Sequence, residues 1–216
     1  MKIRMIYLAA GNSRRFGSNK LLYEIDGKPM FCYGVEALFQ VLEKMEETSL
    51  TVVTNYAEIE EYVRERRLVI EKERVATVKS PDSHMGISYS IRAGIMGTDA
   101  GVCLSSDDRF AVQPGGSLPF PCPDADYYLF CVADQPHISS KTVVRLLRET
   151  TEGGFAGGCV EWDGKSGNPA VFSKELLSEL FALQGDKGGK GILTGREDIC
   201  RVRAGRREEM EDVDFC

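Results

Sequence analysis

Short apolar runs alternate with segments of helical periodicity along most of this 216-residue chain. Runs typical of buried strands occur at 3–8, 50–54, 75–78 and 127–133. Apolar residues recur at helical spacing in 29–45, 56–67, 85–96, 139–149 and 173–183. A hairpin is expected around Asp163-Gly164, with strands at 155–161 and 170–172. This order predicts an α/β domain with a mostly parallel sheet. We expect one domain over 1–216, with an irregular insertion at about 98–126.

The composition of the chain argues against some classes of binding partner and cellular environment. The 27 Lys and Arg residues against 33 Asp and Glu give a net charge of −6, which argues against a nucleic-acid binder. No apolar run is long enough to span a membrane. The seven cysteines form no C-x-x-C pair, so we expect free thiols in a reducing cytoplasm.

The stretch from Leu8 to Lys20 follows the first predicted strand and suits a polyphosphate. Gly11 lets the backbone approach a ligand closely. Arg14, Arg15 and Lys20 supply positive charge for phosphate oxygens. An ordinary loop with a solvated basic tip is the alternative. Three cations within seven residues of an acidic chain favour the anion site.

Asp134 follows the most apolar predicted strand, at the sheet edge where the loop after Leu8 also begins. A carboxylate at that place suits a hard cation such as Mg²⁺. The alternative is a helix cap. The acidic segment 208–214 has the pattern of a solvated tail, and Asp212 and Asp214 are the two residues in it that could reach a metal.

Two further segments have the composition of binding loops. The Gly-rich loop 185–191 offers backbone amides and two lysines to an anion, or is a flexible connection. At the start of the helix predicted over 85–96, Gly86 permits close approach, and Ser88 and Ser90 can bond a base or ribose. The alternative there is a capping Ser83 beside a surface histidine.

Other nucleotide and catalytic motifs are missing. The 185–191 loop does not fit a Walker A sequence, and no G-x-G-x-x-G follows the first strand. Two histidines in no matching pattern give no case for a histidine-based triad or a zinc site.

The segment Leu8-Ala-Ala-Gly-Asn-Ser-Arg-Arg-Phe-Gly-Ser-Asn-Lys20 resembles the L-A-A-G-x-S-x-R-x-G-x-x-K signature of molybdenum-cofactor nucleotidyltransferases. The later motifs of that family have counterparts in the same order: Gly86-x-x-x-Ser90-x-x-x-Gly94, Asp134-Gln-Pro136, Gly167-Asn-Pro169 and Gly185-Asp-Lys-Gly188. Leu-Ala-Ala-Gly and Asp-Gln-Pro are more similar to the cytidylyltransferase branch than to the guanylyltransferase branch. Asn168 stands where many members have histidine.

The resemblance implies a Rossmann-like three-layer sandwich of the nucleotide-diphospho-sugar transferase type. It also implies Mg²⁺-dependent transfer of a cytidylyl group from CTP to molybdopterin, with a molybdenum hydroxylase as client. The implied nucleotide-binding residues are Leu8, Ala9, Ala10, Gly11, Ser13, Lys20, Gly86 and Ser90. The implied catalytic residues are Lys20, Arg15 and Asp134, the metal ligands Asp134 and Asp214, and the acceptor-binding residues Asn168, Asp186 and Lys187.

Two alternatives stay open at this point. The first motif is shared by enzymes that act on other phosphorylated acceptors, such as sugar or polyol phosphates. A non-catalytic accessory protein that binds the molybdenum cofactor is the other. Retention of Arg15, Lys20 and Asp134 together argues against that second alternative.

Overall fold

A computed structural model describes residues 1–11, 19–67, 72–97 and 125–213 of the chain. Its main feature is a seven-stranded sheet with the order β5-β4-β1-β6-β8-β7-β9. Only β8 runs against its neighbours in this sheet, so the predicted mostly parallel sheet is confirmed. The strands are β1 (Ile3–Ala9), β4 (Thr48–Thr54), β5 (Val75–Val78), β6 (Tyr127–Val132), β7 (Gly157–Trp162), β8 (Lys165–Ser173) and β9 (Ile199–Arg203).

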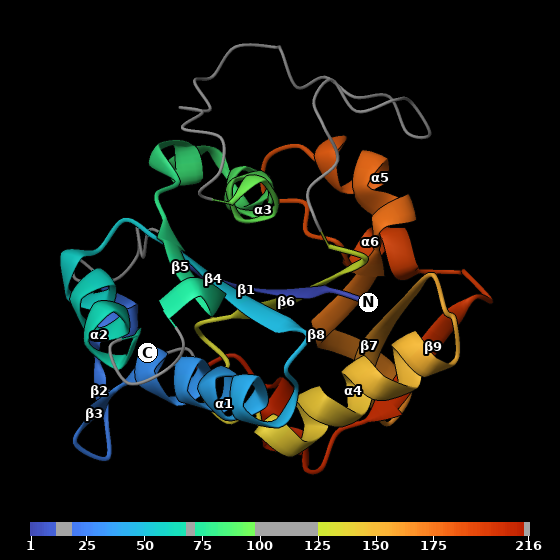
Figure 1. The fold of residues 1–216 in the computed structure, drawn as a ribbon, viewed down its shortest axis with the longest axis horizontal. Coiled ribbons are helices and arrows are strands. Elements are labelled where there is room, and N and C mark those ends of the chain that lie inside the picture. Colours follow the sequence, from blue (N-terminus) through green and yellow to red (C-terminus); the bar gives the residue numbers. More distant parts are fainter. Residues whose placement is uncertain (12–18, 68–71, 98–124, 214–216) are drawn as a thin grey trace.

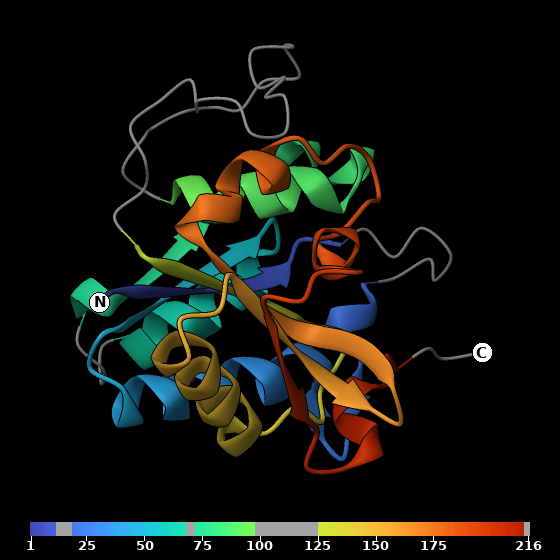
Figure 2. The same ribbon diagram turned by 90° about the vertical axis from the view of Figure 1, so that its right-hand side faces the viewer.

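Helices cover both faces of the sheet and make a three-layer sandwich (Figures 1 and 2). The helices are α1 (Met30–Lys44), α2 (Ala57–Arg67), α3 (Ile87–Met96), α4 (Ser140–Glu152), α5 (Leu177–Phe181) and α6 (Lys190–Leu193). The layers follow from the alternation of side chains along β1. Met5 and Tyr7 pack in the core beneath α1, α2 and α4, whereas Ile6 and Leu8 pack in the core beneath α3 and α5.

Specific hydrogen bonds fix the starts of two helices. Ser139 caps α4, since its hydroxyl accepts a hydrogen bond from the backbone N–H of Thr142 at 3.2 Å. The buried Tyr7 hydroxyl of β1 donates to the Phe31 carbonyl at 2.8 Å and fixes the start of α1 on the sheet.

Two expected helices differ in detail from the structure. The helix expected over 85–96 begins at Ile87, after a 3₁₀ turn η3 (Pro81–Met85), and Gly86 rather than Ser83 stands at its N-cap. The helix expected over 173–183 is a 3₁₀ turn η6 (Lys174–Leu176) followed by α5. Strand β9 and helix α6 were not predicted. Residues 98–124 of the expected insertion lie outside the described residues.

A short hairpin of β2 (Glu24–Ile25) and β3 (Lys28–Pro29) joins the first loop to α1. It is preceded by a 3₁₀ turn η1 (Lys20–Leu22); two more such turns are η2 (Lys72–Arg74) and η7 (Arg207–Met210). Among the described residues, no helix has the length and apolar character needed to cross a membrane. Since β1, β4, β5 and β6 are parallel, the segments that follow them meet at one edge of the sheet.

Candidate functional site

A cavity of about 310 Å³ opens at this carboxyl edge of the sheet. Its wall comes from the end of β1, from η1, from the segment around the start of α3, from the turn after β6 and from the 185–191 loop. The lining residues are Leu8, Ala10, Gly11, Leu21, Ser83, His84, Ile87, Ser90, Val132, Ala133, Asp134 and Asp186. Such a cavity, with an apolar wall and a few polar groups, has the size and character of a small-molecule site.

Lys20 and Asp134 face each other in this site. The Lys20 Nζ lies 3.7 Å from the Asp134 Oδ2, and the side chains are 12% and 36% exposed. Lys20 opens η1, which Asn19 caps by accepting a hydrogen bond from the Leu21 N–H at 3.0 Å. The structure therefore brings the Lys20 ammonium and the Asp134 carboxylate together at the carboxyl edge of the sheet.

Two residues directly after β4 hold the neighbouring segments in place. The Tyr56 hydroxyl donates to the Gly11 carbonyl at 2.8 Å. Burial raises the pKa of Tyr56, which keeps this hydroxyl protonated as a donor. Asn55 donates to the Ser80 carbonyl at 2.8 Å and to the Ser83 hydroxyl at 3.0 Å, and accepts from the Ser80 N–H at 3.0 Å. Sequence reasoning missed both residues, although their place at a strand end was a usable signal.

The start of α3 packs directly on the 185–191 loop. Gly86 has φ +134°, and a Cβ at this position would lie 2.1 Å from the Gly185 carbonyl carbon. The Ser88 N–H donates to the Gly185 carbonyl at 3.1 Å. This contact brings Asp186 to the wall of the same cavity. Ser90 also lines it, and its hydroxyl donates to the Ser80 hydroxyl at 3.3 Å.

The chain after η7 is tied to the turn that carries Asp134. The Gln135 amide donates to the Asp212 Oδ1 at 2.8 Å and to the Met210 carbonyl at 3.3 Å. The Val213 N–H donates to the Asp134 carbonyl at 2.9 Å. These bonds bring the acidic segment expected near a metal next to Asp134.

The remaining predicted site residues have different positions. Ala9 is buried in β1 behind the cavity wall. Asn168 lies in β8 at the same sheet edge, two positions beyond the last pairing of β8 with β6. Lys187 lines a second cavity of about 720 Å³ between α5 and α6. Ser13, Arg15 and Asp214 lie outside the described residues.

The side chains at the cavity are compatible with a Mg²⁺ ion that is bound by few protein ligands. Among the described residues, no three His, Cys, Asp or Glu side chains are grouped to hold a metal ion. Mg²⁺ usually binds through one or two carboxylates together with water and substrate phosphates. A carboxylate at Asp134, facing the cavity beside Lys20, fits that mode.

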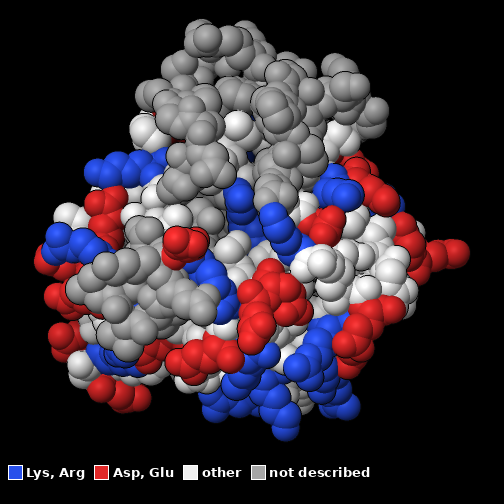
Figure 3. All heavy atoms as spheres, viewed as in Figure 1, with Lys and Arg blue, Asp and Glu red and all other residues white. Residues whose placement is uncertain are grey.

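His84 and Ser83 line the cavity beside the start of α3. The sequence had left open that Ser83 only caps the helix and that His84 is an ordinary surface residue. Their contact with the cavity follows from Asn55, which holds the Ser80–Ser83 turn against β4. Charge on the face shown in Figure 3 is mixed in sign, with Lys and Arg gathered most at its lower edge.

A comparison with known protein families finds a match over most of the chain. The model of the MobA-like NTP transferase domain matches residues 5–200. A "Probable molybdenum cofactor guanylyltransferase" of Thermococcus kodakarensis is 47% identical over 51 residues, which are 24% of this chain and 25% of that protein. The match thus spans about a quarter of the curated relative's length.

Solved structures share the fold. Rv0371c of Mycobacterium tuberculosis H37Rv superposes with a TM-score of 0.64 at 19% identity, over 94% of this chain and 88% of that one. Its complex with manganese gives a TM-score of 0.60 at 19% identity, over 94% and 89% of the two chains.

Proposed function

Because this chain belongs to the family of MobA-like NTP transferase domains, matched over residues 5–200, we propose that it transfers a cytidylyl group from CTP to molybdopterin. The observation that carries the proposal is the pair formed by Lys20 and Asp134, whose charged atoms lie 3.7 Å apart and of which Asp134 lines the cavity. One group suits the triphosphate and the other a divalent cation.

In this reaction an oxygen of the acceptor phosphate attacks the α-phosphorus of the nucleotide. A new P–O bond forms as the bond to the bridging oxygen breaks, and pyrophosphate leaves. Such transfers depend mainly on positioning and on stabilisation of charge. Lys20 neutralises charge that develops on the phosphate oxygens. Gly11 and Ala10 let the nucleotide approach the end of β1 closely.

Asp134 would hold Mg²⁺, with Asp214 as a proposed second ligand. The ion supplies charge neutralisation on the phosphates when bound. Manganese in the complex of the structurally similar Rv0371c is in keeping with a divalent cation. The Asp134 carbonyl is fixed by Val213, so the turn is held in place whatever its side chain binds.

The choice of CTP rests on Leu8-Ala-Ala-Gly11 and Asp134-Gln-Pro136. GTP is the second candidate, because the curated relatives carry the name guanylyltransferase. We assign Gly86 and Ser90 to the base side, and Asn168, Asp186 and Lys187 to the acceptor side. A molybdenum hydroxylase is the client that we propose for the product.

The test is pyrophosphate release from CTP and from GTP, each with molybdopterin and Mg²⁺. We expect release with CTP, and a loss of about a hundredfold in kcat in Lys20→Ala, as for other lost transition-state charge contacts. Lys141→Ala, at an exposed position on α4, is the control and should match the wild type. Absence of release with every nucleotide would overturn the proposal.

A further inference from the structure

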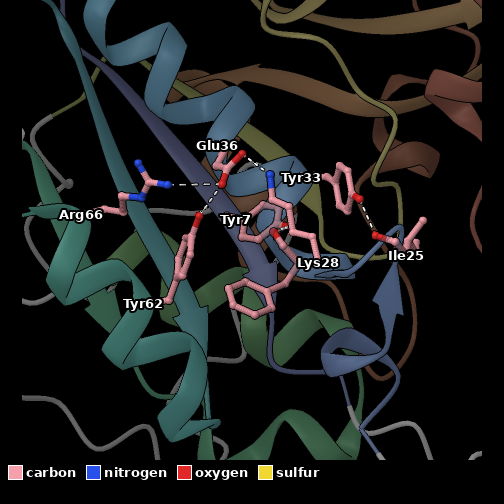
Figure 4. A network of polar contacts seen from close by, with 8 residues as sticks. Tyr7, Ile25, Lys28, Tyr33, Glu36, Tyr62 and Arg66 are labelled. Carbon is pink, nitrogen blue, oxygen red and sulfur yellow. Dashed lines mark hydrogen bonds and ion pairs between the residues drawn. The ribbon is translucent and has the colours of Figure 1, made fainter.

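A polar network centred on Glu36 joins three elements next to the site (Figure 4). Glu36 lies on α1 and accepts hydrogen bonds from the Lys28 ammonium of β3 and from the Tyr62 hydroxyl of α2. The Arg66 Nη2, also on α2, lies 3.6 Å from the oxygen that Tyr62 contacts. One carboxylate therefore links the β2–β3 hairpin, α1 and α2.

Aromatic side chains make this junction stiff. The Tyr33 hydroxyl donates to the Ile25 carbonyl of the hairpin at 2.5 Å, and the Lys28 Nζ lies 4.7 Å from the centre of the Tyr33 ring. On the other side, Phe31 meets the Tyr62 ring edge-to-face at 5.3 Å. Helices α1 and α2 thus contribute the rings of this packed contact, and the hairpin contributes the Lys28 charge and the Ile25 carbonyl.

The Glu36 side chain is only 28% exposed. Burial acts to raise the pKa of Glu36, but the hydrogen bonds from Lys28 and Tyr62 outweigh it, so the pKa is held below its usual range. Glu36 is thus charged at neutral pH, and loss of a partner leaves a half-buried charge with fewer bonds. The geometry of the junction depends on this one carboxylate.

The hairpin side of the junction leads directly to Lys20. Only Tyr23 separates η1 from β2, and the Met30 N–H donates to the Tyr23 carbonyl at 2.9 Å. Leu21 is buried in the same core cluster as Met30 and Phe31. A shift of the hairpin relative to α1 therefore moves the turn that carries Lys20.

The α2 side of the junction leads to Gly11. Tyr56, whose hydroxyl holds the Gly11 carbonyl, accepts a hydrogen bond from the Glu60 N–H at 3.1 Å and so is tied to the first turn of α2. Tyr62 lies further along the same helix. A shift of α2 relative to α1 therefore moves the anchor of Gly11.

We propose that Glu36 is a positioning residue for nucleotidyl transfer, because its network fixes the separation between Gly11 and Lys20 and the placement of Lys20 beside Asp134. The proposal rests on the proposed function for its kinetic consequence. Glu36 lines neither cavity and acts through other residues. A misplacement of a charge by about 1 Å can cost two orders of magnitude in rate, so a small shift at the junction has a large kinetic effect.

Two variants test this with a matched control. Glu36→Gln removes the charge, and Tyr62→Phe keeps the ring but removes one hydrogen bond. We expect kcat to fall about tenfold or more in Glu36→Gln, with a change in KM for CTP of less than about threefold. Glu61→Gln is the control, since Glu61 pairs with Arg64 on the exposed side of α2. It should leave both constants unchanged.

A double-mutant cycle distinguishes positioning from general damage. If Glu36 acts through Lys20, then Glu36→Gln should have little further effect in a Lys20→Ala background. The same full loss in both backgrounds would overturn the proposal. Tyr62→Phe, which keeps the ring packing, provides the cycle if Glu36→Gln fails to fold.

Hydrogen exchange gives a readout that needs no turnover. The N–H groups of Leu22 and Tyr23 are bonded to the Asn19 and Lys20 carbonyls, each at 3.1 Å. We expect them to exchange faster in Glu36→Gln and no faster in Glu61→Gln. A wild type without turnover would refute the proposed function alone, whereas unchanged exchange in Glu36→Gln would refute the positioning role.

Discussion

Replacement of Gly86 by alanine tests the packing of α3 against the 185–191 loop. Gly86 has φ +134° and ψ 166°, a region that is nearly restricted to glycine and costs other residues about 1–3 kcal/mol. The new Cβ would lie 2.1, 2.3 and 2.6 Å from three backbone atoms of Gly185, which cannot rotate away as a flexible side chain does. The loop must therefore move as a whole.

The expected cost follows from these contacts. To reach ordinary contact the closest pair must separate from 2.1 to 3.4 Å, which strains the bond from the Ser88 N–H to the Gly185 carbonyl. Overpacking costs about 1–3 kcal/mol and a weakened hydrogen bond about 1 kcal/mol. Together with the backbone term we expect Gly86→Ala to lower the free energy of unfolding by roughly 3–7 kcal/mol.

Urea denaturation measures this cost, and the melting temperature should fall by roughly 6–28 °C for a chain of this size. Gly188→Ala is the matched control in the same loop, because a Cβ there meets nothing within 4 Å and its φ is not positive. Its stability should stay within about 0.5 kcal/mol of the wild type. Equal stabilities of the two variants would refute the close approach, and with it the account of how Asp186 reaches the cavity.

Asp134→Asn removes a carboxylate that we assign to Mg²⁺ and should lower the rate of pyrophosphate release by about a hundredfold or more. Asp163→Asn, in the exposed β7–β8 turn, is the control. A fully active Asp134→Asn variant would show that Asp134 is not a ligand of the metal. Lys187→Ala should raise the KM for molybdopterin and leave the KM for CTP unchanged. Initial rates measured at varied concentrations of molybdopterin and of CTP will show this. A change in the KM for CTP alone would contradict the assignment of Lys187 to the acceptor side. The pKa of Glu36 is lowered on folding, so its charge stabilises the fold above its unfolded pKa of about 4.3 and this contribution is lost as the pH falls through the folded value. Urea denaturation should accordingly show a difference between wild type and Glu36→Gln that is constant near neutral pH and shrinks below about pH 4; a difference that grows in acid would contradict this sign. Four buried cysteines should not react with a thiol reagent until the protein unfolds: Cys32, Cys131, Cys159 and Cys200. No more than three of the seven cysteines should therefore react in the native state.

The elements that the sequence predicted are those whose apolar pattern decides their burial. All of β1 except Arg4 is buried, and its pattern alone placed the strand. By contrast, β9 contains the exposed Arg201 and Arg203 and only pairs with β7, so its apolar content is too low for a pattern to find it. Helix α6 has four residues and no side-chain cap, which leaves no periodic signal.

The residues of the candidate site also fall into two groups, those with a local signal in the sequence and those without one. Lys20 and Asp134 were predicted because their chemistry and their place after strands are local facts of the sequence. Asn55 and Tyr56 were missed because their roles are contacts with Ser80 and Gly11, which lie 25 and 45 positions away in the chain. Residue types alone do not reveal which backbone carbonyl a side chain will meet.

The hydrogen bonds at the carboxyl edge explain how short segments can form one cavity. Tyr56 holds the end of β1, Asn55 holds the turn before α3, Ser88 holds the 185–191 loop, and Val213 holds the turn after β6. Each of these bonds reaches a backbone carbonyl, so it fixes the course of the chain whatever side chains the segment carries. Residues that face the cavity can therefore change without loss of its frame. Side chains that line the cavity, such as that of His84, therefore shape its interior without being part of the hydrogen bonds that form its frame.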